Sequence, residues 1–158
     1  MPIYRAITCA TLFVGLFLQA ASKVTVPPAK VRKALKLDAF YQKHVDVGGF
    51  SVVAVKFKTN YALLEAAFLI RQMVGPRDDI LKAMAKNKVR FGIMAHNELT
   101  TQIPEHRTLQ PRLYWNKRAR GLGASRARPV VTCGEENLLG YKDDPYSKEN
   151  ILIHELAH

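Results

Sequence analysis

The sequence predicts an α+β domain over residues 35–158, with a mixed sheet and packed helices. Nearly half of the 158 residues are hydrophobic and 23% are charged, which is a globular composition and excludes a disordered chain. Strand-like and helix-like runs follow in the order helix, strand, helix, helix, strand, strand, helix. Because strands and helices do not alternate regularly, this order does not predict a doubly wound parallel sheet.

Residues 1–22 are predicted to be a secretory signal peptide. Arg5 supplies a basic start, residues 6–18 are uncharged and mostly apolar, and Ala20 and Ser22 fit a cleavage site. The alternative is a membrane anchor, but the apolar run is shorter than the roughly 20 residues that span a bilayer. We therefore expect a secreted protein.

Cleavage of the signal peptide would leave Cys133 as the single cysteine of the chain. A lone cysteine cannot form an internal disulfide, so a disulfide-stapled fold is excluded. The apolar residues before Cys133 favour a buried thiol, and the alternative is a partner cysteine in a longer chain.

The segment after the signal peptide is expected to form a flexible lead-in, a short helix and a turn. Residues 23–34, with a Pro-Pro pair and several lysines, predict a flexible lead-in. Residues 35–44 predict a short helix, with Leu37, Phe40 and Tyr41 on one side. A Gly-Gly turn follows that helix.

The middle of the chain carries the clearest helix and strand patterns. Strands are expected at residues 50–57, 89–95 and 129–133, and helices at residues 62–74 and 78–87. Valine and phenylalanine favour the strands, and the first helix is apolar over most of its surface. The second helix begins with two acids and ends with lysines, which suits the helix dipole. Residues 96–128 are expected to be mostly irregular, because prolines and glycines interrupt them.

The end of the chain predicts a turn followed by a helix. The sequence Asp-Asp-Pro at 143–145 is typical of a turn. Ser147 is expected to cap a helix that runs from Lys148 towards His158, with Glu149 in its first turn.

That last helix contains a metal-ligand pattern, His-Glu-x-x-His. His154 and His158 are four residues apart and therefore share one face of a helix, where two imidazoles can grip one zinc ion. Glu155 lies beside them and can take a proton from a water molecule, which then attacks a peptide carbonyl. The alternative is a pair of ordinary surface histidines, because short motifs also occur by chance.

The stretch NILIHELAH, from Asn150 to His158, resembles the active-site helix of zincin metallopeptidases. The preceding CGEENLLG at 133–140 and DPYS at 144–147 are similar to secreted zincin-like proteins, which loosely resemble the lethal-factor-like peptidase domain of bacterial toxins. The resemblance spans residues 35–158 and implies the N-terminal half of a zincin-like domain. It implies His154 and His158 as zinc ligands and Glu155 as the general base.

The chain departs from the zincin pattern at its third ligand. Zincins take that ligand from residues after the second histidine, and no residue follows His158. A catalytic zinc needs three protein ligands and an open position. We therefore expect a fragment, a truncated product or a degenerate copy of a secreted zinc metallopeptidase. The third ligand for Zn²⁺ is expected downstream, and this form of the chain is expected to be inactive.

Five further residues have the chemistry to contribute to a site. His44, His96 and His106 could act as ligands, but surface positions are expected for each. Glu135 and Glu136 could shape a cleft, although a solvated face is the simpler expectation. No dinucleotide-binding residues are expected, because the GLG at 121–123 lacks the full spacing.

A basic stretch suggests the second class of function. Residues 112–120 carry four cations interleaved with Tyr114 and Trp115, and Arg126 and Arg128 follow. Such interleaving suits nucleic acid, but a secreted chain rarely meets it, so no nucleic-acid partner is expected. We expect a solvated basic loop with Trp115 in the core. The alternative to a peptidase with a peptide or protein substrate is a non-catalytic secreted protein that binds anionic polysaccharide or a membrane surface.

Overall fold

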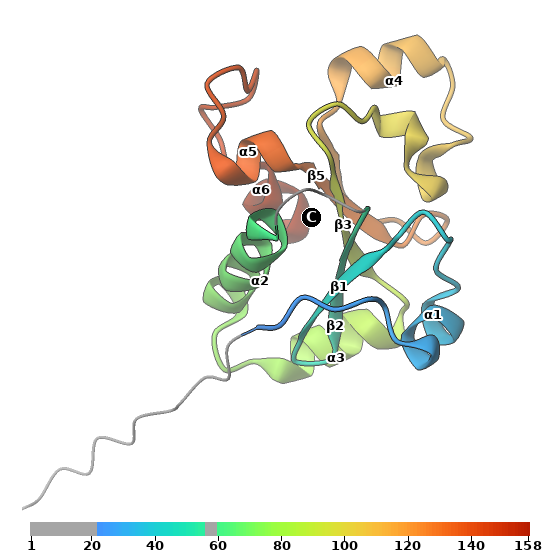
Figure 1. Ribbon diagram of the computed structural model, residues 1–158, viewed down its shortest axis with the longest axis vertical. Coiled ribbons are helices and arrows are strands. Elements are labelled where there is room, and N and C mark those ends of the chain that lie inside the picture. The colour runs from blue at the N-terminus through green and yellow to red at the C-terminus, as the bar shows by residue number, and fades with distance from the viewer. Residues whose placement is uncertain (1–21, 56–59) are drawn as a thin grey trace, which may run out of the picture.

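The protein is an α+β domain built on a five-stranded mixed sheet (Figure 1). The computed structural model describes residues 22–55 and 60–158, so the predicted signal peptide, apart from Ser22, lies outside the described residues. The sheet order is β1-β2-β3-β5-β4, with β2, β3 and β5 parallel and the two edge strands antiparallel. The strands are β1 (Lys43–Val47), β2 (Phe50–Ala54), β3 (Arg90–Met94), β4 (Gly121–Leu122) and β5 (Val130–Gly134).

Six α-helices and two short 3₁₀ turns connect these strands in the described part of the chain. The helices are α1 (Ala29–Leu35), α2 (Tyr61–Val74), α3 (Asp78–Lys86), α4 (Arg112–Arg118), α5 (Glu135–Leu139) and α6 (Ile151–Ala157). The 3₁₀ turns are η1 (Thr100–Gln102) and η2 (Pro104–His106). Within residues 22–55 and 60–158, no helix combines the length and the apolar character needed to cross a bilayer.

The main core lies between one face of the sheet and helices α2, α3, α5 and α6. Side chains of a strand alternate between faces, so Val52 of β2 points into this core and Val53 points to the opposite face. There Val53 meets Leu37 and Tyr41 in a smaller cluster. Leu152 of α6 is fully buried in the main core, so α6 is fixed against the sheet by apolar packing.

The N-terminal segment differs from the expected flexible lead-in and short helix. Thr25 forms an antiparallel bridge with His44, and residues 29–35 form helix α1, so residues 23–34 are joined to the fold. The helix expected at residues 35–44 is wrong. Helix α1 already ends at Leu35, and residues 43–47 form strand β1, which pairs with β2 across the turn at residues 48–49.

The strands and helices expected in the middle of the chain are confirmed, whereas the region after them differs in detail. The predicted strands are confirmed as β2, β3 and β5 within the described residues, and the two central helices are confirmed as α2 and α3. The region at 96–128, expected to be mostly irregular, contains the short elements η1, η2, α4 and β4 between irregular segments. Trp115 of α4 is half-buried and lies outside both apolar clusters, so its expected place in the core is wrong.

Candidate metal centre

Helix α6 presents its two histidines on the side away from the core. Asn150 caps the helix, and its side-chain oxygen accepts a hydrogen bond from the Ile153 amide at 3.1 Å. The expected cap at Ser147 is therefore wrong, and the helix begins three residues later than expected. Ile151 and Leu152 are buried at its start, whereas His154 and His158 are exposed.

The structure brings His154, Glu155 and His158 together as a group that could hold a metal ion. Their ligand atoms all lie within 4.8 Å of one another, and no other such group occurs in residues 22–55 and 60–158. The Nε2 atoms of the two histidines are 3.2 Å apart. Two nitrogens bound tetrahedrally to one zinc, each at roughly 2.0–2.1 Å, would lie about 3.3 Å apart. The spacing of the two imidazoles therefore already suits a shared ion.

The carboxylate of Glu149 lies next to the ring of His154. Oε2 of Glu149 lies 3.7 Å from Nδ1 of His154, on the ring nitrogen opposite the one that faces His158. Metal-binding histidines usually present their second nitrogen to a carboxylate, a carbonyl or water, which sets the orientation and basicity of the ring. Glu149, expected in the first turn of the helix, instead precedes it and supplies this outer contact.

Strand β4 lies directly against α6 because two glycines allow the approach. A Cβ placed on Gly121 would lie 2.2 Å from Cγ2 of Ile151 and 2.8 Å from the Thr132 carbonyl oxygen, so no larger residue fits without a shift. A Cβ on Gly123 would lie 3.4 Å from Oε2 of Glu155. A pocket of about 290 Å³ opens beside this contact, and residues 118–122, Tyr146, Glu149, Ile151, His154 and Glu155 line it.

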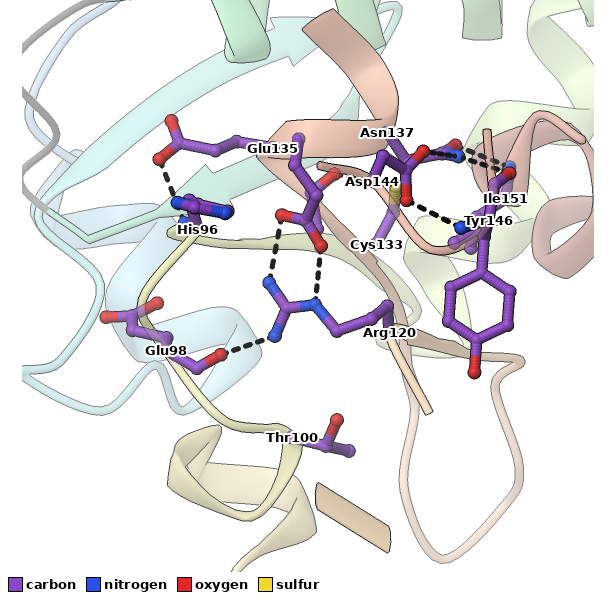
Figure 2. Close-up of polar contacts among 12 residues, drawn as sticks. His96, Glu98, Thr100, Arg120, Cys133, Glu135, Asn137, Asp144, Tyr146 and Ile151 are labelled. Carbon is purple, nitrogen blue, oxygen red and sulfur yellow. Dashed lines mark hydrogen bonds and ion pairs between the residues drawn. The ribbon is translucent and has the colours of Figure 1, made fainter. Parts of the chain in front are cut away.

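The side chain of Asn137 on α5 holds the chain that leads into α6, from Asp144 to Ile151 (Figure 2). Its amide nitrogen contacts the Asp144 carboxylate at 2.8 Å and the carbonyls of Tyr146 and Glu149 at 3.2 and 3.0 Å. Its oxygen accepts a hydrogen bond from the Ile151 amide at 2.8 Å. The start of the histidine helix is therefore tied to α5 by polar contacts as well as by apolar packing.

Arg120, which lines the pocket, forms a buried ion pair (Figure 2). Nε and Nη2 of Arg120 donate to the two carboxylate oxygens of Glu136 at 2.5 and 2.9 Å. Nη2 also donates to the Ala95 carbonyl, and Nη1 of Arg120 donates to the Glu98 carbonyl. Glu136 is 2% exposed, so the solvated position expected for it is wrong. The bidentate pair connects the residue before β4 to the first turn of α5.

None of the upstream histidines joins the α6 group within the described residues. His44 and His106 are buried rather than exposed, and burial lowers the pKa of His106 to about 4. Burial also lowers the pKa of His44. His96 is exposed as expected, and its Nε2 lies 2.9 Å from the Asp143 carboxylate. The two buried histidines therefore belong to the packing of the domain.

Cys133 is buried beneath this region, as its apolar approach predicted. Burial raises the pKa of its thiol, so the side chain stays protonated and behaves as an apolar group. Glu135 is half-buried, and its carboxylate accepts a hydrogen bond from the His96 amide at 2.9 Å. It therefore fixes the loop after β3 and does not point at the histidine pair.

The motif itself identified the three central residues, but not their supports. Asn137, Arg120 and Gly121 act through contacts with residues far away in the sequence, and only the GLG at 121–123 was a visible signal. These supports contact the segments around the group, and none of them belongs to it. No family model, no curated protein and no solved structure matches this chain.

Proposed function

We propose that α6 carries the zinc site of a metallopeptidase, with His154 and His158 as ligands and Glu155 as the general base. The observation that carries the proposal is the 3.2 Å separation of the two Nε2 atoms, with Glu155 between them on the helix. Exposed histidines four apart on a helix need not turn the same ring nitrogen towards one another. Here both Nε2 atoms face each other, and the Glu149 carboxylate lies next to the other ring nitrogen of His154.

A bound zinc would supply an acidified water and a polarised carbonyl, which is the chemistry that peptide hydrolysis needs. Glu155 is half-buried beside the histidines and lines the adjacent pocket, so its carboxylate can accept a proton from a water molecule there. The adjacent pocket gives a substrate room next to that carboxylate.

Strand β4 favours an extended peptide as the substrate. It lies at the edge of the sheet and pairs with β5 alone in the described fold. The edge strand of a sheet offers backbone donors and acceptors to which an extended peptide can add as another strand. Because residues 121–123 contact α6, a peptide in that position would pass close to the histidine pair.

A third ligand is the part of the site that these residues do not provide. A catalytic zinc takes three protein ligands and leaves one position open. The described residues bring only His154, Glu155 and His158 together. Residues 1–21 and 56–59 contain no His, Asp or Glu, and their one cysteine, Cys9, lies within the predicted signal peptide. We therefore propose that the third ligand comes from outside this sequence. This sequence by itself should then bind zinc weakly and hydrolyse little.

The test separates binding from hydrolysis in the longest chain that the gene encodes around this sequence. Zinc content and cleavage of a quenched fluorescent peptide library are measured for the wild type and for Glu155→Gln. We expect Glu155→Gln to keep its zinc and to lose at least about 100-fold in hydrolysis, because general-base catalysis contributes that much. Glu65→Gln on α2 makes the same chemical change at a residue outside the metal-binding group and should leave both readouts unchanged. Equal hydrolysis by the wild type and Glu155→Gln would refute the proposal.

A further inference from the structure

Helix α4 is attached to the domain by its polar side. The Asn116 side-chain oxygen accepts a hydrogen bond from the Thr101 amide at 2.9 Å, and Nε of Arg112 lies 3.4 Å from the Thr101 hydroxyl. Nε1 of Trp115 donates to the Gln110 carbonyl at 3.1 Å. A surface helix ordinarily turns its apolar side to the core and its polar side to water. Here the side-chain hydrogen bonds to the rest of the protein come from Arg112 and Asn116 and reach Thr101 of η1, whereas the Trp115 bond stays local to the start of the helix.

The opposite side of α4, which we name the α4 face, combines apolar and cationic residues. It consists of Leu113, Tyr114, Lys117 and Arg118, all of them exposed. The pairs 113/117 and 114/118 are each four residues apart and therefore stack along one side of the helix. Leu113 is 67% exposed and Tyr114 is 52% exposed. The Arg118 guanidinium lies 6.0 Å from the centre of the Tyr114 ring.

The chain segment that contains the α4 face carries an excess of positive charge. Residues 106–134 contain seven arginines and lysines and no aspartate or glutamate. Two of these cations are neutralised, because Arg107 pairs with Asp38 and Arg120 pairs with Glu136. The other five have no carboxylate within ion-pair distance in the part of the chain that the structure describes. This region therefore attracts an anionic surface.

We propose that the α4 face docks onto an anionic lipid bilayer. Cations with an exposed aromatic and an aliphatic side chain between them are the pattern of a helix that lies in a membrane interface. Lys117 and Arg118 would meet the lipid phosphates, while Leu113 and the Tyr114 ring enter the boundary of the acyl chains. An anionic polysaccharide would use the cations but would leave two large apolar side chains in water. The bilayer accounts for both kinds of residue.

Docking on this face would also place the candidate metal centre at the membrane. The main-chain carbonyl of Arg118 accepts a hydrogen bond from the Tyr146 hydroxyl, and both residues line the pocket beside α6. The docking itself does not depend on zinc or on hydrolysis. It can therefore be tested separately from the proposed peptidase function.

Co-sedimentation with vesicles tests the proposal in the full chain. Vesicles of equal parts phosphatidylserine and phosphatidylcholine are compared with vesicles of phosphatidylcholine alone. The double variant Lys117→Glu/Arg118→Glu should bind the anionic vesicles at least about 25-fold more weakly, because each cation near such a surface contributes about fivefold. Leu113→Ser/Tyr114→Ser should also weaken binding, by at least about tenfold.

The matched control is Lys82→Glu/Lys86→Glu on α3, which changes the net charge equally at two exposed positions four residues apart. It should bind within about threefold of the wild type. Equal losses in both charge-reversed variants would overturn the proposal in favour of diffuse charge attraction. Full binding by Leu113→Ser/Tyr114→Ser, together with displacement by heparin, would assign the face to polysaccharide instead. No binding of the wild type to anionic vesicles would refute it outright.

Discussion

Replacing Asn137 by alanine should destabilise the domain more than its half-buried position suggests. The side chain contacts three acceptors and one donor around the start of α6. Its amide nitrogen has two hydrogens for three acceptors, so we count three hydrogen bonds in all. At about 0.5–1.5 kcal/mol for each net bond, Asn137→Ala should lower the free energy of unfolding by about 3 kcal/mol.

Urea denaturation followed by far-ultraviolet circular dichroism measures this loss. The control is Asn87→Ala, which removes one exposed hydrogen bond, from the Asn87 side chain to the Ala83 carbonyl at 3.0 Å. That change should lower the free energy of unfolding by at most about 1 kcal/mol. If the two variants are equally stable, Asn137 does not hold the histidine helix, and the polar account of its position fails.

Two further perturbations follow from the packing around the site. Gly121→Ala should lower the free energy of unfolding by about 1–3 kcal/mol, because its Cβ would overlap Ile151, and an unchanged midpoint in urea would disprove that close contact. His106 has a folded-state pKa of about 4, below its unfolded value, so only the unfolded chain gains the proton as the pH falls below about 6.5. The free energy of unfolding should therefore fall by about 2 kcal/mol through His106 as the pH is lowered from 7 to 5. Titration of its ring by nuclear magnetic resonance should show it neutral at pH 5, and a protonated ring there would contradict this.

The central strands and helices could be predicted because their local patterns agree with their tertiary environment. Strand β2 is rich in β-branched residues and is buried on both faces, as the valine-rich sequence indicates. Helix α2 is apolar on most sides because it packs against the sheet, α5 and α6. Where one segment is buried on several sides, composition alone identifies it.

Strand β1 was missed because two patterns overlap in one short segment. Leu37, Phe40 and Tyr41 have helical spacing, yet they pack with Val53 from extended and turn conformations. The alternation that follows, with Val45 and Val47 buried and Asp46 exposed, is that of a strand. Gly48 and Gly49 both have positive φ and close the two-residue hairpin with β2, so the Gly-Gly turn was the stronger signal.

The group of His154, Glu155 and His158 could be predicted because its members lie within about one turn of one helix. A spacing of four residues places both imidazoles on the same face whatever the rest of the fold does. The supports could not be predicted, because Arg120 and Glu136 look like ordinary surface residues until the fold buries them together. Asn137 likewise contacts residues 7 to 14 positions away, and no local pattern reports such a contact.

Zinc titration of the purified protein at neutral pH, by calorimetry, tests the central claim most directly. We expect one zinc per chain and at least a tenfold loss of affinity in His158→Ala, because that change removes one of the two proposed nitrogen ligands. His96→Ala, which removes an exposed histidine outside the group, should leave the affinity unchanged. Equal zinc affinity in the wild type and His158→Ala would show that α6 does not hold the ion, and would contradict the account.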